Sequence, residues 1–145
     1  MKLIKNYMKI LIAKETNQLR SGKVNAKLYP FWAEFYALAK EHQFIEINSK
    51  LNTKQLIELV NSVDCVISID SFLPHFIKYH NLKPRVIVLW GQSDPLIFGY
   101  PDNINLLKDR KYLRPDQFGW WEDLNANNEA FVSPETLLGA LNGII

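Results

Sequence analysis

The sequence has a single cysteine, Cys65, and almost no net charge, so several classes of protein are excluded at the outset. One cysteine cannot form an intramolecular disulfide, and the apolar residues around Cys65 indicate a thiol packed in a core. The formal net charge is +2, and the lysines and arginines are scattered along the chain, which argues against binding to nucleic acid. No run approaches the roughly 18 apolar residues of a membrane span, so we expect no transmembrane segment.

Metal-ligand, leader and phosphate-loop signatures are also missing. No His/Cys cluster has the spacing of a zinc site, so we expect no metal. Residues 1–12 carry lysines at positions 2, 5 and 9 and lack the unbroken apolar region of a signal peptide, which favours the cytoplasm. Gly22-Lys23 is not a P-loop, because Asn17 replaces the required upstream glycine and Val24 follows the lysine.

What the sequence does have is an alternation of apolar strands and amphipathic helices. Apolar residues make up 48% of 145 residues, enough for one domain over 1–145. The expected strands cover residues 7–13, 44–47, 66–69 and 85–90. The expected helices begin at Pro30, at Asn52 or Thr53, and at Phe72, with a last one over 133–143. Residues 91–129 are expected to form a long loop region, with a short strand at 103–107 as an option. The pattern predicts an α/β fold: a Rossmann-like open parallel sheet with helices on both faces.

The most informative stretch is the strand at 66–69 together with the helix start immediately after it. Asp70 and Ser71 stand at the strand end, and a second apolar run begins at Phe72 with His75 in its first turn. Ligand sites of open α/β sheets lie at the carboxyl ends of strands. We expect Ser71 to cap the helix, and the N–H groups at its start to favour a phosphate.

Three elements in this order resemble glycosyltransferase family 9, the heptosyltransferase-like enzymes. They are Lys27-Leu28-Tyr29-Pro30, Asp70-Ser71-Phe72-Leu73-Pro74-His75, and Gly91-Gln92-Ser93-Asp94-Pro95 after a strand. The resemblance covers most of the chain, but only the C-terminal half of such an enzyme. It implies the second Rossmann-like domain of a GT-B fold.

The resemblance also implies a set of donor-binding residues. Lys27 would meet a diphosphate, Leu51 would pack on the base, and His75 would line the donor pocket. Asp70 would accept a sugar hydroxyl or orient neighbouring donors. The full set is Lys27, Leu51, Asp70, Ser71, Phe72, His75, Gly91 and Asp94. Each has a structural alternative: Asp70 as a cap of backbone amides, His75 as a helix-face histidine and Lys27 as a solvated lysine.

Two positions depart from the family. Tyr29 replaces a tryptophan, which is a mild change. Phe72 stands where the family has glycine, and a phenyl ring there would either fill part of the pocket or stack on the donor. The identity of the donor, and donor binding itself, depend on this position.

The function implied by the resemblance is binding of a nucleotide-diphosphate sugar, with an ADP-sugar favoured, for an inverting transferase of cell-surface glycan or lipopolysaccharide biosynthesis. No Asp-x-Asp pair of the metal-dependent transferases is present. The acceptor site and the general base would belong to an N-terminal domain, in cis or in trans, and no catalytic residue is assigned here. We therefore expect the isolated chain to be inactive, in the cytoplasm or peripheral at the inner membrane surface.

Two other functions are considered. The first is a non-catalytic nucleotide-binding or protein-interaction module derived from the same family, which Phe72 and the missing half favour. In the transferase interpretation, Trp120 and Trp121 are expected to be exposed and to dock the partner domain. The second is a signalling receiver, which also has an aspartate at a strand end. A receiver needs an acidic pair after its first strand, where this chain has Lys14 and a lone Glu15, so this alternative is disfavoured.

Overall fold

Five parallel strands form one sheet in the computed structural model, which describes residues 7–47 and 50–144. The order is β2-β1-β3-β4-β5. The strands are β1 (Lys9–Ala13), β2 (Gln43–Glu46), β3 (Cys65–Ile69), β4 (Arg85–Trp90) and β5 (Ile104–Leu107). The predicted α/β class with an open parallel sheet is confirmed. Residues 1–6, on which the leader argument partly rests, lie outside the described residues.

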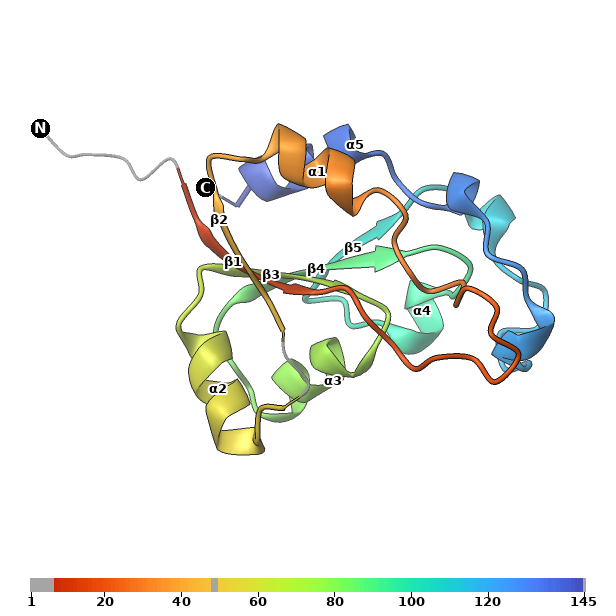
Figure 1. Ribbon diagram of the computed structural model, residues 1–145, viewed down its shortest axis with the longest axis horizontal. Helices are drawn as coiled ribbons and strands as arrows, with labels where there is room; N and C mark the ends of the chain where they lie inside the picture. Colours follow the sequence, from red (N-terminus) through yellow and green to blue (C-terminus); the bar gives the residue numbers. More distant parts are fainter. Residues whose placement is uncertain (1–6, 48–49, 145) are drawn as a thin grey trace, which may run out of the picture.

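Helices cover both faces of this sheet, as predicted. Figure 1 shows α1 (Trp32–Leu38) and α5 (Pro134–Asn142) on one face. It shows α2 (Thr53–Asn61) and α3 (Phe72–Tyr79) on the other. No helix within 7–47 and 50–144 is long and apolar enough to cross a bilayer.

The strands are apolar on both sides because each face has its own core. In β3, Ile67 and Ile69 pack with α1 and α5, whereas Val66 packs with α2 and α3. All five β3 residues are buried, and β4 is exposed only at Arg85. Continuous apolar strands of this kind are expected when helices cover both faces of a parallel sheet.

The first helix is shorter than predicted. It begins at Trp32 instead of Pro30, and it ends at Leu38, whereas its apolar spacing predicts a helix through about Glu41. The reason lies in Tyr29, which is buried and donates its hydroxyl to the Val132 carbonyl at 3.0 Å. This bond fixes the segment before the helix as a connector packed on the start of α5.

The optional strand predicted at 103–107 is present as β5, and most of the region 91–129 is irregular. The region also contains α4 (Pro95–Phe98) and the short 3-10 helices Arg110–Tyr112 and Trp121–Asp123, with a third, Asn128–Ala130, at its end. Asp94 caps α4 by accepting from the Leu96 N–H at 2.9 Å, and Pro95 occupies the first turn, where a missing N–H costs nothing.

The start of α3 also differs from the prediction. Ser71 stands at the N-cap position, but its side chain makes no capping hydrogen bond. A cap accepts from the second or third helical N–H, and the third helical residue here is Pro74, which has none. The proline therefore removes one of the two partners on which the predicted cap depends.

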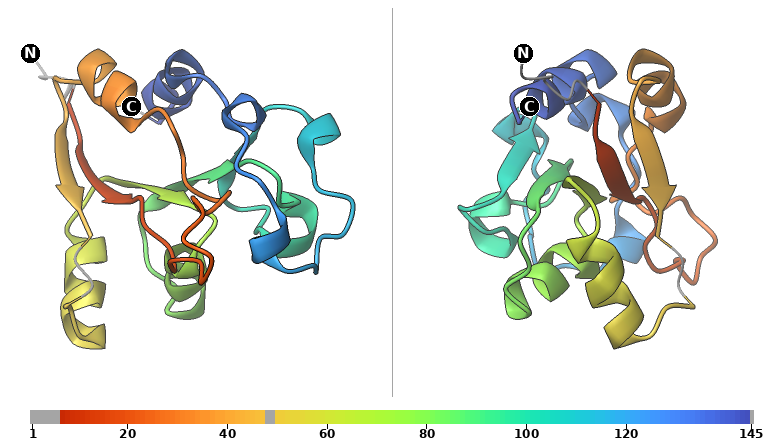
Figure 2. Two further views of the ribbon diagram at one scale, coloured as in Figure 1. Left: turned by 45° about the vertical axis from the view of Figure 1, so that its right-hand side comes forward. Right: turned by 90° about the vertical axis from the view of Figure 1, so that its left-hand side faces the viewer.

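Two loops distant in sequence meet at the carboxyl edge of the sheet. The Glu122 carboxylate accepts from the backbone N–H of Arg20 at 3.0 Å, across 102 residues, and from that of Ser21 at 3.3 Å. These backbone N–H groups hold the pKa of Glu122 below its usual value. In Figures 1 and 2 the loop after β1 and the segment near residue 120 lie side by side. Together they enclose the space above the strand ends.

Candidate functional site: a cleft at the carboxyl edge of the sheet

A cleft of about 240 Å³ opens where the strand order reverses, between β1 and β3. This is the position at which open α/β sheets bind ligands. It is lined by the residue after β3, by residues of α3 and α4, by the segment after β4, and by the loops that follow β1 and β5. The lining residues that carry its chemistry are Lys27, Asp70, His75, Ser93, Arg114 and Trp121.

Lys27 and Asp70 form an ion pair inside this cleft. The Lys27 Nζ lies 3.5 Å from the Asp70 Oδ2, and both side chains are largely buried. Asp70 follows the last residue of β3, while Lys27 comes from the loop after β1. The pairing means that much of the lysine charge is balanced before any ligand arrives.

His75 is held by a tyrosine. Its Nδ1 lies 2.7 Å from the Tyr100 hydroxyl, and the two rings meet edge to face. The first turn of α3 thus presents the imidazole to the cleft in a fixed orientation. With Nδ1 on the tyrosine, Nε2 is the ring nitrogen left for a ligand.

A second cation, Arg114, lies on the ring of Trp121. The guanidinium carbon is 3.8 Å from the ring centroid, and the Lys27 Nζ is 4.7 Å from the centroid of the same ring. Arg114 is only 8% exposed, and this burial lowers the pKa of its guanidinium from the usual value. Trp121 therefore brings two cations to one wall of the cleft.

Two polar groups at the cleft are buried without a partner among the described residues. They are the Ser93 hydroxyl, on a side chain that is 3% exposed, and the Nε of Arg114. Buried polar groups are nearly always hydrogen-bonded, so each unpaired one needs an explanation, and a bound ion, water or ligand is one. Both belong to segments that follow β4 and β5.

Gln117 fixes the position of this arginine segment. Its amide nitrogen donates to the carbonyls of Gln92 and Arg114 at 3.0 and 2.9 Å, and its amide oxygen accepts from the Asp94 N–H at 2.8 Å. The Arg114 Nη2 in turn donates to the Gln117 carbonyl at 2.9 Å. One glutamine thus ties the segment carrying Arg114 to the end of β4.

Gln117→Ala is expected to lower the free energy of unfolding by about 2 kcal/mol, because it leaves the Asp94 N–H and the Arg114 carbonyl without their partner and removes one of two donors to the Gln92 carbonyl. Urea unfolding followed by circular dichroism measures the loss. Gln43→Ala is the matched control, since this exposed glutamine makes no side-chain hydrogen bond to a described residue. Equal losses of stability in the two variants would show that the hydrogen bonds of Gln117 do not hold this segment.

The structure brings three of the sequence-predicted site residues into the cleft: Lys27, Asp70 and His75. Ser71 lies beside it, against a second hollow too small to hold a ligand. Phe72 is 59% exposed and packs edge to face on Phe76, outside the cleft lining.

The other three predicted site residues have structural surroundings. Leu51 packs against the core under α2 and α3. Gly91 is covered by the ring of Phe131, so close that a Cβ there would lie 2.5 Å from the Phe131 Cζ. Asp94 is buried and bound by Arg110, whose Nη1 and Nη2 donate to its two carboxylate oxygens at 3.0 and 2.7 Å. None of these three lines the cleft.

Acid stability should depend on this Asp94–Arg110 pair. The hydrogen bonds from Arg110 hold the pKa of Asp94 below its usual value, so the pair stabilises the fold above the unfolded pKa of about 3.9. That stabilisation is lost as the pH falls through the lower folded pKa. We expect Arg110→Gln to reduce the drop in stability between pH 5 and 2, measured by urea unfolding. An unchanged drop would show that the pair does not contribute.

Sequence reasoning missed Arg114 and Gln117, and placed Trp121 on an exposed docking surface with Trp120. Trp120 is indeed 78% exposed, but Trp121 is partly buried under the arginine. The one signal in the sequence was the density of aromatic residues around 112–121, which indicated order without indicating partners. A cation–π pair leaves no recognisable spacing in a sequence.

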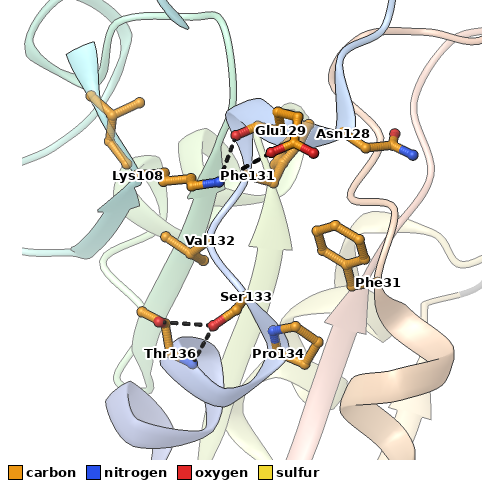
Figure 3. A pocket seen from close by; sticks show the side chains of 10 residues that line it. Phe31, Lys108, Asn128, Glu129, Phe131, Val132, Ser133, Pro134 and Thr136 are labelled. Carbon is orange, nitrogen blue, oxygen red and sulfur yellow. Dashed lines mark hydrogen bonds and ion pairs between the residues drawn. The ribbon is translucent and has the colours of Figure 1, made fainter. Parts of the chain in front are cut away.

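A larger hollow of about 420 Å³ lies near the start of α5 (Figure 3). Its polar groups are bonded to one another: the Ser133 hydroxyl accepts from the Thr136 N–H at 3.1 Å, and the Lys108 Nζ donates to the Glu129 carbonyl at 2.9 Å. Phe31, Phe131 and Val132 supply an apolar lining. No sequence-predicted site residue lines it, so the smaller cleft is the better candidate.

Comparisons with protein-family models, with curated proteins and with solved structures found no match for this chain. Within residues 7–47 and 50–144, no group of three or more His, Cys, Asp or Glu side chains is placed to hold a metal ion. Function is therefore inferred from the residues and their geometry.

Proposed function

We propose that this chain binds a nucleotide-diphosphate sugar in the cleft above β1 and β3, as the donor-binding domain of an inverting, heptosyltransferase-like glycosyltransferase. One observation carries the proposal: Lys27, Asp70 and His75, which the family resemblance marks from separate segments, line the same cleft. Its position at the switch point of a parallel sheet supports a ligand site there.

The chemistry of the lining suits a sugar diphosphate. Lys27 and Arg114 offer positive charge to phosphate oxygens, and His75 offers a ring nitrogen. Asp70 offers the one lining carboxylate, which suits a sugar hydroxyl better than a phosphate. The mixture of cations with a single acid therefore favours a ligand with both groups.

Aromatic side chains at the rim supply a surface for the base. Phe98 and Phe118 line the cleft and meet edge to face, with ring centroids 5.5 Å apart. Phe118 is 78% exposed, so one face of its ring is free to stack on a planar ligand. Such a ring can stack on a purine or on a pyrimidine, so it does not indicate which nucleotide binds.

Isothermal titration calorimetry with ADP, UDP, GDP and CDP tests the proposal. At least one diphosphate should bind, its nucleoside should bind much more weakly, and backbone NMR signals of Lys27 and of 70–75 should shift. Lys27→Gln should weaken binding by about 1 kcal/mol, because Asp70 already balances much of the Lys27 charge. Arg85→Gln, at the opposite edge of the sheet, is the matched control. No binding by any of the four would overturn the proposal.

The alternative is a module that binds nucleotide and catalyses nothing, and one observation favours it for the isolated chain. The one carboxylate that lines the cleft, Asp70, is already paired with Lys27, which makes it a poor base. Transfer needs donor, acceptor and base together. We therefore place the acceptor and the base on a second domain, in cis or in trans.

The purified chain should accordingly release no nucleotide diphosphate from sugar donors, with or without acceptor glycans. A coupled assay for free diphosphate measures this, with a complete two-domain transferase as the positive control. Acceptor-dependent release that disappears in His75→Ala would place the base in this cleft and contradict the expectation.

A further inference from the structure

We infer that Arg114, with the Ser93 hydroxyl beside the same cleft, forms an oxyanion subsite that takes a phosphate of the ligand, and that Arg114 is the principal phosphate-binding cation in place of Lys27. This rests on the proposed function for the identity of the ligand. The subsite itself is argued from charge and burial in the cleft.

The two cations of the cleft differ in how their charge is balanced. Lys27 has a carboxylate, that of Asp70, at 3.5 Å. Arg114 forms no ion pair with any residue in 7–47 or 50–144, although it is the more buried of the two residues. The charges of Asp116 and Asp70 act on it only from beyond ion-pair distance. A buried charge with no carboxylate in contact costs stability, and a phosphate of the ligand would supply the missing contact.

The guanidinium of Arg114 has donors to spare. Its Nη2 donates to the Gln117 carbonyl at 2.9 Å, whereas Nε is buried without a partner in the described chain. The planar fork of an arginine matches two oxygens of one phosphate. Trp121 holds one face of the guanidinium plane at 3.8 Å, which leaves its edge to bind.

The hydroxyl of Ser93 is a second unused donor. It is buried, unpaired in the described chain, and part of the same cleft lining as Arg114. A hydroxyl donates well to a phosphate oxygen. Two unpaired donors from different segments, both more than nine-tenths buried, thus converge on one cleft.

The experiment titrates inorganic pyrophosphate and the four nucleoside diphosphates into the chain and into Arg114→Met, Arg114→Lys, Ser93→Ala, Lys27→Gln and Arg85→Gln. Arg114→Met should weaken both kinds of ligand roughly 10- to 100-fold. Arg114→Lys should recover part of the affinity, because it keeps the charge without the fork. Ser93→Ala should lose less than Arg114→Met, and Arg85→Gln nothing.

The stability of the ligand-free chain distinguishes a ligand-binding arginine from a structural one. Without ligand, Arg114→Met should unfold at the same urea concentration as the parent or a higher one, because it removes a buried charge whose burial costs more than its distant interactions with Asp116 and Asp70 return. A structural arginine would instead lose stability and binding together. If Arg114→Met does not fold, Arg114→Lys and Ser93→Ala carry the test.

The outcomes separate this inference from the proposed function. Pyrophosphate binding that needs Arg114, without binding of any nucleotide, upholds the subsite and overturns the nucleotide. Nucleotide binding that needs Lys27 but tolerates both Arg114 variants overturns the subsite and keeps the function. Binding of neither ligand by the parent chain overturns both.

Discussion

Gly91→Ala is expected to lower the free energy of unfolding by about 1–3 kcal/mol, the usual range for overpacking a core. The added Cβ would lie 2.5 Å from the Phe131 Cζ and 2.9 and 3.0 Å from its two ε carbons. Phe131 is itself buried in the core between the sheet and α5, so its ring cannot move out of the way without disturbing its neighbours. Urea unfolding monitored by circular dichroism measures the change.

Two further variants make this result specific. Gly139→Ala adds the same methyl group inside α5, where nothing lies within 4 Å, and should raise stability by about 0.5–1 kcal/mol. Phe131→Leu in the Gly91→Ala background should recover part of the loss, because the smaller side chain leaves room for the methyl group. If Gly91→Ala keeps full stability but loses nucleotide affinity, the glycine serves the ligand, as the family resemblance implies.

The sheet and its helices were predictable because their signals are local. The apolar runs of β3 and β4 predict buried parallel strands without reference to any other part of the chain. Asn52 predicts the start of α2 for the same reason: its side chain accepts from the Gln55 N–H at 2.8 Å, within one turn. Each of these signals needs only a few neighbouring residues.

Local signals failed where a distant or neighbouring contact overrode them. Pro30 is a good first helical residue, yet α1 begins later because the Tyr29 hydroxyl is bonded to Val132, 103 residues away. Ser71 is a good cap, yet Pro74 removes one of the N–H groups it would bind. The missing cap of α3 could have been predicted from the sequence, since Ser71 and Pro74 belong to the same helical turn.

The residues of the candidate site also fall into those that local sequence signals predict and those that distant contacts bring in. Asp70 and His75 belong to one strand–helix junction, so the sequence itself predicted that they would be close. Arg114 enters the cleft because its backbone N–H donates to the Gln92 carbonyl at 3.0 Å, because Gln117 ties the same segment to the end of β4, and because Trp121 packs on its guanidinium. Contacts between loops of irregular backbone have no period to detect, and the sequence therefore predicted the acid and the histidine but not the arginine.

Asp70→Asn is expected to separate the affinity for a nucleotide diphosphate from that for the corresponding nucleotide sugar. Removing the carboxylate takes a negative charge away from the phosphates, and the diphosphate alone should bind more tightly, roughly up to tenfold. The sugar loses a charged hydrogen-bond acceptor for its hydroxyl, which is worth about 1.5–3 kcal/mol. The asparagine keeps the size of the side chain and can still accept from Lys27.

The ratio of the two dissociation constants is the quantity to measure. Electrostatic effects on the phosphates act on both ligands and largely cancel in this ratio, although the bare diphosphate carries an additional charge on its terminal phosphate. The change in the ratio beyond that of the control variant therefore reports the contact between Asp70 and the sugar. The sugar's advantage over the bare diphosphate should fall roughly 10- to 100-fold in Asp70→Asn, by isothermal titration calorimetry at constant ionic strength.

Asp116→Asn is the matched control for that measurement. The Asp116 charge also acts on Arg114, but its side chain is exposed, and Asp116 does not line the cleft. An asparagine can still accept from the Phe118 N–H, as Asp116 does at 3.0 Å. This variant should shift both dissociation constants together and leave their ratio unchanged. If the ratio is also unchanged in Asp70→Asn, the Asp70 carboxylate does not bind a sugar hydroxyl, because loss of such a contact would weaken the nucleotide sugar more than the diphosphate. Asp70 would then serve only to hold Lys27.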